Sequence, residues 1–376
     1  MDQRSRLPAA SNDGAGEPDS VQVTEISFRH TFRALKYRNY RLFFFGQLVS
    51  LIGTWMEHTA MGWLVYQLSG SKFLLGLVAA AGTAPMLLLS LWGGSVADRY
   101  PKRSILVVTQ SVSMTLAFIL AAIVWMGHVE PWHIVCVAVV NGVAMAFDMP
   151  ARQAFVIELT SREDLLNAIS LNSSVFNGAR LLGPAVAGLV LERFSAAVCF
   201  LLNGVSFLAV IGSLLLMRIA RVARERSDLS AKEHALGGLS YVRQNARVLT
   251  IMTLFGIVGI FGWSYSVLMP AYAKDILGLS AKGYGMLLSA NGMGALIGAL
   301  TIAAAGHRFQ PRKIALAGLW LFSAALLAFS QVRQFQLALL FLLLVGFGMM
   351  LFFSTSNTTV QSIVPDDMRG RVMAMY

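Results

Sequence analysis

The sequence predicts an all-α protein that crosses a lipid bilayer many times, and three observations carry this prediction. Of the 376 residues, 56% are hydrophobic and 13% are charged, whereas soluble domains carry about 25% charged residues. The mean hydropathy is +0.64 over the whole chain. The apolar residues gather in ten runs, each near the roughly 20 residues that a helix needs to span a bilayer. Because backbone groups inside lipid must bond within their own segment, we expect helices rather than strands.

A polar tail precedes the first apolar run. Residues 1–26 are rich in Ser, Asp, Gly and Pro, and we predict that they are disordered. They contain no apolar stretch of the kind found in cleavable signal peptides, so the first span is expected to direct its own insertion. Residues 27–41 place Phe28, Phe32 and Leu35 on one helical face among basic residues. This pattern indicates an interfacial helix or, alternatively, a regulatory or partner-binding arm.

The ten apolar runs alternate with polar segments, so consecutive spans are expected to cross the bilayer in opposite directions. The fourth run is short and is extended by polar sequence of helical character. In chain order the predicted spans are Leu42–Tyr66, Leu74–Val96, Ile105–Met126, Trp132–Phe147, Ala168–Val190, Ala196–Met217, Val248–Pro270, Tyr284–Ala305, Ile314–Ser330 and Leu337–Phe353.

Basic residues set the predicted orientation. If the N-terminus is cytoplasmic, 24 of the 30 Lys and Arg residues lie on the cytoplasmic side and five on the other, while Arg180 lies inside a span. The positive-inside rule selects this orientation. The same distribution explains the net charge of +11 as a topology signal, so we expect no nucleic-acid partner.

Composition divides the chain into four parts. Residues 1–41 form the cytoplasmic tail and interfacial helix, and residues 42–217 form an N-terminal half of six spans. Residues 218–247 form a polar cytoplasmic loop, and residues 248–376 form a C-terminal half with four spans.

Motifs of the first half recur in the second. Ser71-x4-Gly76 returns 209 residues later, and the segment Gly142–Asp164 has a weaker counterpart 204 residues later. The two halves are therefore predicted to be repeats in the same orientation. Parallel repeats of six helices are typical of one large class of secondary transporters.

Six stretches of the sequence form a recognisable set of motifs: Tyr40–Gln47, Gly53–Met56, Gly62–Tyr66, Ala97–Arg99, Phe147–Ala154 and Gly183-Pro184. Together they resemble the major facilitator superfamily, in the branch that includes enterobactin exporters and macrolide efflux proteins. The resemblance covers residues 32–376 and implies two parallel halves of six helices, the second ending here at the start of the eleventh helix. We expect either a fragment or a truncated protein.

One family motif lies in the predicted loop between the second and third spans. The resemblance implies that Gly94 lets two helices approach closely, and that Asp98 and Arg99 form a conformational latch to the eleventh helix. A proline stands where the family has a glycine, so the turn geometry is expected to differ. The alternative is that the basic residues only set topology, which is our prediction for Lys102 and Arg103.

Two ionisable residues stand inside predicted spans, where charge is costly and indicates function. Glu57 shares a polar stripe with Gln47 and Thr54, and Arg180 shares one with Asn177. At 1.5 Å per residue they lie about 22 and 18 Å from the same membrane face. The superfamily fold places these spans side by side, so we predict an intramembrane ion pair. Three roles stay open for it: a static pair, a proton-linked switch, or a substrate contact.

A second candidate pair lies near the end of the fourth span. Asp148 and Arg152 are four residues apart with the acid first, the favourable order for a helical ion pair. Asn141 shares their face, and Pro150 is expected to kink the helix. The pair is predicted either to fix the cytoplasmic end of the helix or to act as a gate or proton site.

Three further features are candidates for the transport path. Gly183-Pro184 resembles the fifth-helix signature of proton antiporters, which implies a close-packed bend against the other half; a plain packing kink is the alternative. Trp263 and Asn291 are predicted to line a cavity, and with Gln47, Thr54, Asn141 and Asn177 they complete the cavity candidates. An aromatic side chain near a membrane end is otherwise an interfacial anchor.

The absence of certain sequence motifs excludes other classes of protein. The sequence contains no phosphate-binding loop and no Cys or His pattern with metal-ligand spacing. We therefore expect no enzyme activity, no cofactor and no metal. The predicted function is proton-coupled export of a small amphipathic, drug-like or siderophore-like compound by a monomer in the bacterial inner membrane. Uptake by the same fold and a non-transporting scaffold or fragment are the alternatives.

Overall fold

The computed structural model describes residues 32–161, 163–218, 240–306, 309–365 and 372–373. Four predictions fall wholly or partly outside these residues. They are the disordered tail over 1–26, the interfacial helix over 27–41, most of the central loop, and the start of the eleventh helix around Arg369.

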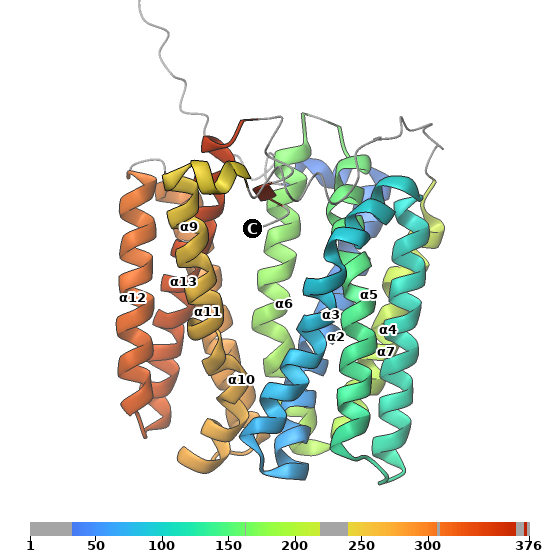
Figure 1. Ribbon diagram of the computed structural model, residues 1–376. Helices are drawn as coiled ribbons and strands as arrows, with labels where there is room; N and C mark the ends of the chain where they lie inside the picture. Colours follow the sequence, from blue (N-terminus) through green and yellow to red (C-terminus); the bar gives the residue numbers. More distant parts are fainter. Residues whose placement is uncertain (1–31, 162, 219–239, 307–308, 366–371, 374–376) are drawn as a thin grey trace, which may run out of the picture.

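The first half contains one short 3-10 turn and six long helices (Figure 1). These are η1 Arg33–Lys36, α2 Arg38–Ser69, α3 Lys72–Arg99, α4 Lys102–Trp125, α5 Pro131–Glu158, α6 Leu165–Arg193 and α7 Ala196–Leu216. The described part of 27–41 contains η1 and the first turn of α2, separated by Tyr37 in an extended conformation. The interfacial helix over 27–41 stays a prediction, because residues 27–31 lie outside the described residues.

The second half contains four helical spans, as predicted, but the first of them is not a regular α-helix. It consists of α9 Ala246–Ile257, a π turn over Val258–Gly262, α10 Ser264–Ala271 and a second π turn over Tyr272–Ile276. The other three are α11 Ala281–Ala305, α12 Pro311–Gln331 and α13 Phe335–Ile363.

Nine helical segments of the described residues are long and apolar enough to cross a membrane. The helix α2, the first of the ten predicted spans, does not meet this hydropathy test although it is 32 residues long. Polar side chains such as Gln47, Ser50 and Glu57 lower its hydropathy, and all three are buried inside the protein. It packs along α6 and α7 within the bundle.

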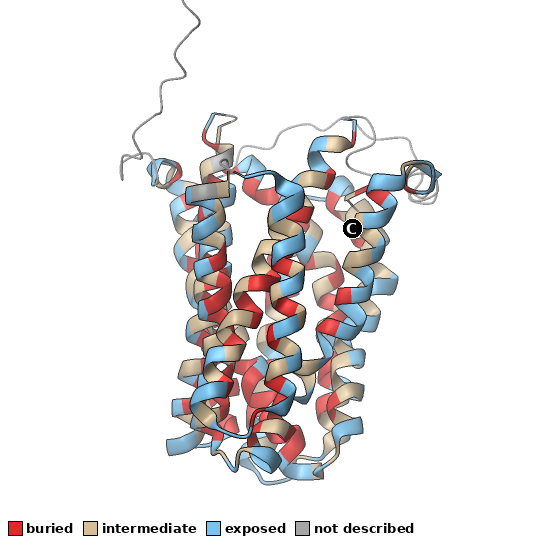
Figure 2. Ribbon diagram, turned by 90° about the vertical axis from the view of Figure 1, so that its left-hand side faces the viewer, coloured by how far each residue is buried: buried red, intermediate tan, exposed pale blue. Residues whose placement is uncertain are grey.

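The helices form two groups that meet along α6 and α11 (Figure 1). We call the end where α3 finishes at Arg99 and α4 begins at Lys102 the basic end, and the opposite end the distal end. Buried residues gather on the inward faces of the helices, while the outward faces are exposed (Figure 2). The exposed residues include large apolar ones such as Leu87 and Trp320, as expected for surfaces that contact lipid.

Glycines let neighbouring backbones approach within each half. A methyl group on Gly142 of α5 would lie 2.4 Å from the carbonyl oxygen of Gly82 in α3. In the second half, a methyl group on Gly346 of α13 would lie 2.0 Å from the carbonyl oxygen of Asn291 in α11. These contacts fix α3 against α5 and α11 against α13.

Candidate functional site

A positively charged side chain lies where the two halves meet. Arg180 of α6 donates a hydrogen bond to Oδ1 of Asn291 in α11 at 2.6 Å. Its guanidinium carbon lies 5.9 Å from the ring centre of Trp55 in α2 and 5.5 Å from that of Trp263. Both distances are within the range of cation–π attraction. Residues from both halves therefore surround this one cation.

Asn291 connects the cation to the rest of the second half. Its side-chain amide donates to the hydroxyl of Tyr265 at 2.9 Å and to the carbonyl of Leu342 at 3.3 Å. Asn291 is only 5% exposed, so its orientation is fixed by these bonds. The predicted cavity residues Trp263 and Asn291 thus lie together at Arg180.

Glu57 does not pair with Arg180, and the predicted ion pair is wrong for this conformation. Glu57 accepts a hydrogen bond from Asn203 of α7, whereas Trp55 of the same helix faces Arg180. Two residues along a helix turn the side chain by about 200°, so Trp55 and Glu57 point to nearly opposite sides. Similar depth in the membrane did not determine which neighbouring helix Glu57 would face.

The pair of Asp148 and Arg152 is present and belongs to a larger polar cluster. Nε of Arg152 lies 2.8 Å from Oδ1 of Asp148. The other carboxylate oxygen accepts from Thr109 and Gln110 of α4, each at 2.7 Å. Arg152 also donates to the side-chain oxygen of Gln47 in α2. This buried cluster therefore joins α2, α4 and α5.

Two amide atoms at the edge of this cluster have no hydrogen-bond partner. They are Nε2 of Gln47, a donor, and Oε1 of Gln110, an acceptor. Buried polar groups without partners are costly and are uncommon in proteins. Gln47 was predicted as a cavity residue, while Thr109 and Gln110 were not singled out. Their signal in the sequence is polarity inside an otherwise apolar span.

The other predicted cavity residues do not join either cluster. Thr54 donates to the carbonyl of Ser50 at 2.9 Å, and Asn177 donates to that of Ser173 at 2.9 Å, both within their own helices. Asn141 accepts from Ser113 of α4 at 2.8 Å. Asn203, the partner of Glu57, was missed by sequence reasoning, although an amide in the very apolar run Ala196–Met217 is a visible signal.

The predicted latch differs from the structure in one respect. Gly94 faces open space, and the close approach is made by Gly93, where a methyl group would lie 2.0 Å from the carbonyl oxygen of Ala146 in α5. Asp98 and Arg99 are exposed at the basic end, and neither makes an ion pair with another described residue. The eleventh helix, their expected partner, lies outside the described residues.

Lys102 and Arg103 have structural contacts, so the prediction that they only set topology is wrong. The Lys102 side chain is fully buried and its Nζ lies 2.7 Å from Oε1 of Glu158, which joins the start of α4 to the end of α5. Arg103 donates to the carbonyls of Leu215 and Met217 at the end of α7. Both residues therefore fix helix ends.

The Gly183-Pro184 segment packs in two directions. A methyl group on Gly183 would lie 2.4 Å from Cβ of Trp55, so this glycine faces α2 of its own half rather than the other half as predicted. The contact with the other half comes from the next residue, since the carbonyl oxygen of Pro184 lies against Gly285 of α11.

Aromatic and charged residues join the two halves at the distal end. The hydroxyl of Tyr66 in α2 donates to Asp275, and Lys274 lies 5.8 Å from the ring centre of Tyr66. Trp63 stacks on Tyr284 of α11 at 5.4 Å between ring centres. The hydrogen bonds that join two described residues across the halves lie at this end or at the level of Arg180.

At the basic end, the ion pairs between two described residues lie within the first half. Nζ of Lys36 lies 2.6 Å from Asp164, and Nε of Arg33 lies 2.9 Å from the same carboxylate. The hydrogen bond with Lys36 lowers the pKa of Asp164, and the same bond raises the pKa of Lys36. Within the described ranges no group of His, Cys, Asp and Glu residues is arranged to hold a metal ion.

The bundle of two helical groups around a shared polar site defines a membrane transporter of the major facilitator type, which confirms the predicted superfamily and fold. The chain belongs to a family described as transmembrane secretion effectors, whose model matches residues 29–376.

Relatives and solved structures agree with this assignment. The chain is 25% identical to the staphyloferrin A transporter of Staphylococcus aureus over 341 residues, which cover 89% of this chain and 84% of that protein. It is 26% identical to the multidrug efflux pump Tap of Mycolicibacterium fortuitum, in a match that covers 89% of this chain and 83% of that protein. The fold is similar to that of a bacterial homolog of the human lysosomal transporter Spinster in an inward-facing, unoccupied conformation, with a TM-score of 0.69 and 12% sequence identity. The match covers 93% of this chain and 78% of that chain.

Proposed function

We propose that this protein is a proton-coupled secondary transporter that exports a small amphipathic compound from the bacterial cytoplasm by alternating access, acting as a monomer. The observation that carries the proposal is the cluster around Arg180, in which a cation, two indole rings and an amide come from both halves. A site shared by two halves changes shape when the halves move relative to one another. The relative named as a multidrug efflux pump supports export, and the one named as the staphyloferrin A transporter supports a small-molecule substrate.

The conformation is assigned from the contacts between the halves. They hold the distal end together through Tyr66 with Asp275 and Trp63 with Tyr284, while no described hydrogen bond joins the halves at the basic end. The positive-inside rule assigns the basic end to the cytoplasm. We infer that the Arg180 site faces the cytoplasm in this conformation, and that export requires the distal contacts to break.

The Arg180 site favours a substrate with aromatic rings and an acidic or carbonyl oxygen. Arg180 has no acidic partner among the described residues, and its amide partner Asn291 is neutral. A cation inside the membrane is costly without a counter-charge, so an oxygen of the substrate would be attracted to it. Trp55 and Trp263 offer flat apolar surfaces on either side.

Glu57 is the proposed proton carrier. It is 7% exposed and its described partner is the neutral amide of Asn203. A carboxylate in the bilayer interior costs at least about 2.5 kcal/mol without a cation, which favours its proton-bound form in this conformation. Asp148, by contrast, has the Arg152 guanidinium as its partner. We propose that Glu57 loses its proton when the halves move, and that Asp148 holds the first half together.

The test is substrate flux driven by a pH gradient in inside-out vesicles that contain the full-length gene product. A panel of fluorescent dyes and iron-chelating compounds serves as the probe. We expect Glu57→Gln to abolish proton-driven accumulation and Arg180→Gln to raise the apparent KM. The matched control is Arg193→Gln, which changes an exposed arginine of the same helix at the distal end.

Each outcome decides between the alternatives. Unchanged proton-driven transport in Glu57→Gln would exclude this residue as the coupling site. Accumulation only when the gradient is reversed would indicate uptake by the same fold. No transport of any probe by the wild type would favour a non-transporting scaffold.

A further inference from the structure

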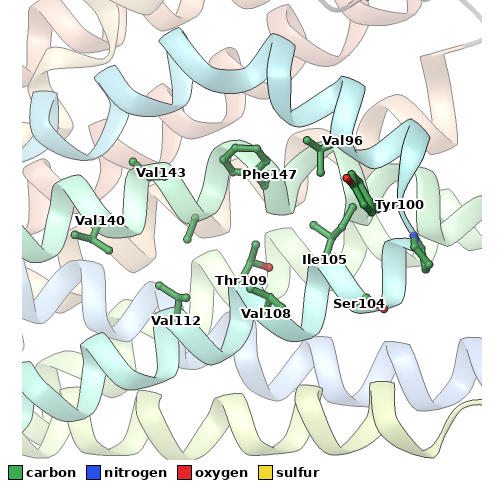
Figure 3. A pocket seen from close by; sticks show the side chains of 12 residues that line it. Val96, Tyr100, Ser104, Ile105, Val108, Thr109, Val112, Val140, Val143 and Phe147 are labelled. Carbon is green, nitrogen blue, oxygen red and sulfur yellow. The ribbon is translucent and has the colours of Figure 1, made fainter. Parts of the chain in front are cut away.

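A groove on the outer surface of the first half is separate from the Arg180 site. It has a volume of about 680 Å³, which is within the usual range for small-molecule sites. Its walls come from α3, α4 and α5 (Figure 3). None of its lining residues belongs to α6 or to the second half, so it does not open into the space between the halves.

The groove opens toward the membrane. Val108 of α4 and Val140 of α5 line it and are 62% and 45% exposed. Along α4 its lining runs from Ser104 to Val112, which is about 12 Å at 1.5 Å per residue. That length is less than half of the roughly 30 Å hydrocarbon core. The groove therefore lies within one leaflet, beginning at the basic end.

The interior of the groove is apolar. Valine, isoleucine, alanine and phenylalanine side chains make most of its surface. The buried Thr109 is a polar exception, but its hydroxyl donates to the carboxylate of Asp148 at 2.7 Å. Its hydrogen-bonding capacity is thus directed into the protein. A hydrocarbon chain can fill such a groove without leaving a polar group unpaired.

Among the described residues, Arg99 is the one cation near the mouth of the groove that has no described partner. Tyr100 and Ser104 line the mouth at the basic end. Arg99 precedes Tyr100, is exposed, and lies three residues after Val96, which lines the groove, so Arg99 and Val96 share a helix face. Asp98 lies two residues after Val96 and points to the opposite face.

The neighbouring cations are already engaged. Lys102 is paired with Glu158, and Arg103 donates to two carbonyls of α7. Arg99 makes no hydrogen bond or ion pair within the described ranges, so its guanidinium can donate hydrogen bonds to a phosphate. An exposed tyrosine such as Tyr100 at this level is also typical of the headgroup region.

We propose that this groove binds one phospholipid from the leaflet at the basic end, with an acyl chain between α3, α4 and α5 and its phosphate at Arg99. The cation beside the mouth attracts the phosphate, and the apolar groove, which lies within one leaflet, holds part of an acyl chain. The bound lipid covers the outer side of the helices that hold the Asp148 cluster. It is therefore a structural ligand of the first half, distinct from the transported compound.

The test measures lipid binding directly and does not depend on transport. The full-length protein is delipidated in mild detergent, and binding of phosphatidylglycerol is followed by native mass spectrometry. We expect the wild type to retain one lipid with an affinity at least tenfold above that of further lipids. Val108→Trp and Val140→Trp, which fill the groove from two exposed positions, should reduce that affinity at least tenfold. Arg99→Gln should reduce it about fivefold.

Matched controls separate the groove from the rest of the lipid-facing surface. Ile119→Trp adds the same side chain to an exposed position of α4 on the face of Val108 but outside the groove. Arg193→Gln removes an exposed arginine at the distal end. Both should bind lipid as the wild type does. Equal loss in Ile119→Trp, unchanged binding in both groove variants, or displacement of the lipid by a transported dye would overturn the proposal.

Discussion

Replacing Asp148 by Asn tests how the first half is held together. The Asp148 side chain is 1% exposed and that of Arg152 is 17% exposed. The substitution keeps the shape of the side chain and removes its charge, so Arg152 stays as a nearly buried cation without a counter-ion. Breaking a buried ion pair from one side costs about 3–5 kcal/mol. Because Arg152 is partly exposed, we expect the lower end of this range, about 3 kcal/mol.

The assay is reversible unfolding in mixed micelles, in which the fraction of denaturing detergent is raised stepwise. The same change at the exposed Asp98, Asp98→Asn, is the control and should alter stability by less than about 0.5 kcal/mol. The double variant Asp148→Asn/Arg152→Gln should be more stable than Asp148→Asn alone, because it removes the uncompensated cation. A loss below about 1 kcal/mol in Asp148→Asn, or a double variant no more stable than the single one, would refute the reasoning.

Two further predictions concern α3 and the basic end. Gly93→Ala places a methyl group 2.0 Å from a carbonyl oxygen and should lower the free energy of unfolding by about 1–3 kcal/mol in the same assay. The control is Gly94→Ala, whose methyl group meets open space, and it should be neutral or slightly stabilising. Equal losses of stability in the two variants would contradict the assignment of the close contact to Gly93. The pKa of Asp164 is lowered from its ordinary value of 3.8, and that of Lys36 is raised from 10.5. The stability contributed by the lowered Asp164 pKa is therefore present above pH 3.8 and lost as pH falls through its folded value, while the contribution of Lys36 is lost above pH 10.5. Asp164→Asn should consequently destabilise at neutral pH and approach the wild type as the pH falls. A stability difference that does not shrink with falling pH, taken from thermal melts, would argue against the pair.

Sequence patterns predicted the features that depend on one helix at a time. The helical class and the pair of Asp148 with Arg152 follow from apolar length and from a spacing of four residues, both of which are local. The seventh span was predicted as one helix although it contains two π turns, because hydropathy does not report the number of residues per turn.

Contacts between helices were harder to predict, because they depend on rotation about each helix axis. Glu57 was expected at Arg180 because the two residues lie at similar depth on spans that the superfamily fold places side by side, but it faces Asn203 while Trp55 faces Arg180. The same cause explains why the close approach falls at Gly93 and not at Gly94: neighbouring residues point about 100° apart. Asn291 was predicted as a cavity residue, but predicting its hydrogen bond to Arg180 would have required knowing that α6 lies against α11.

The glycine contacts have a consequence for how the two halves came to differ. Gly82 and Asn291 occupy the same place in the repeat, 209 residues apart, and their carbonyl oxygens meet Gly142 and Gly346, which are 204 residues apart. Each half thus uses one backbone contact at the same position. In the first half that position has no side chain; in the second it carries the amide that holds Arg180. The backbone contact therefore places the Asn291 amide beside Arg180, and a change of the amide side chain would leave that contact in place.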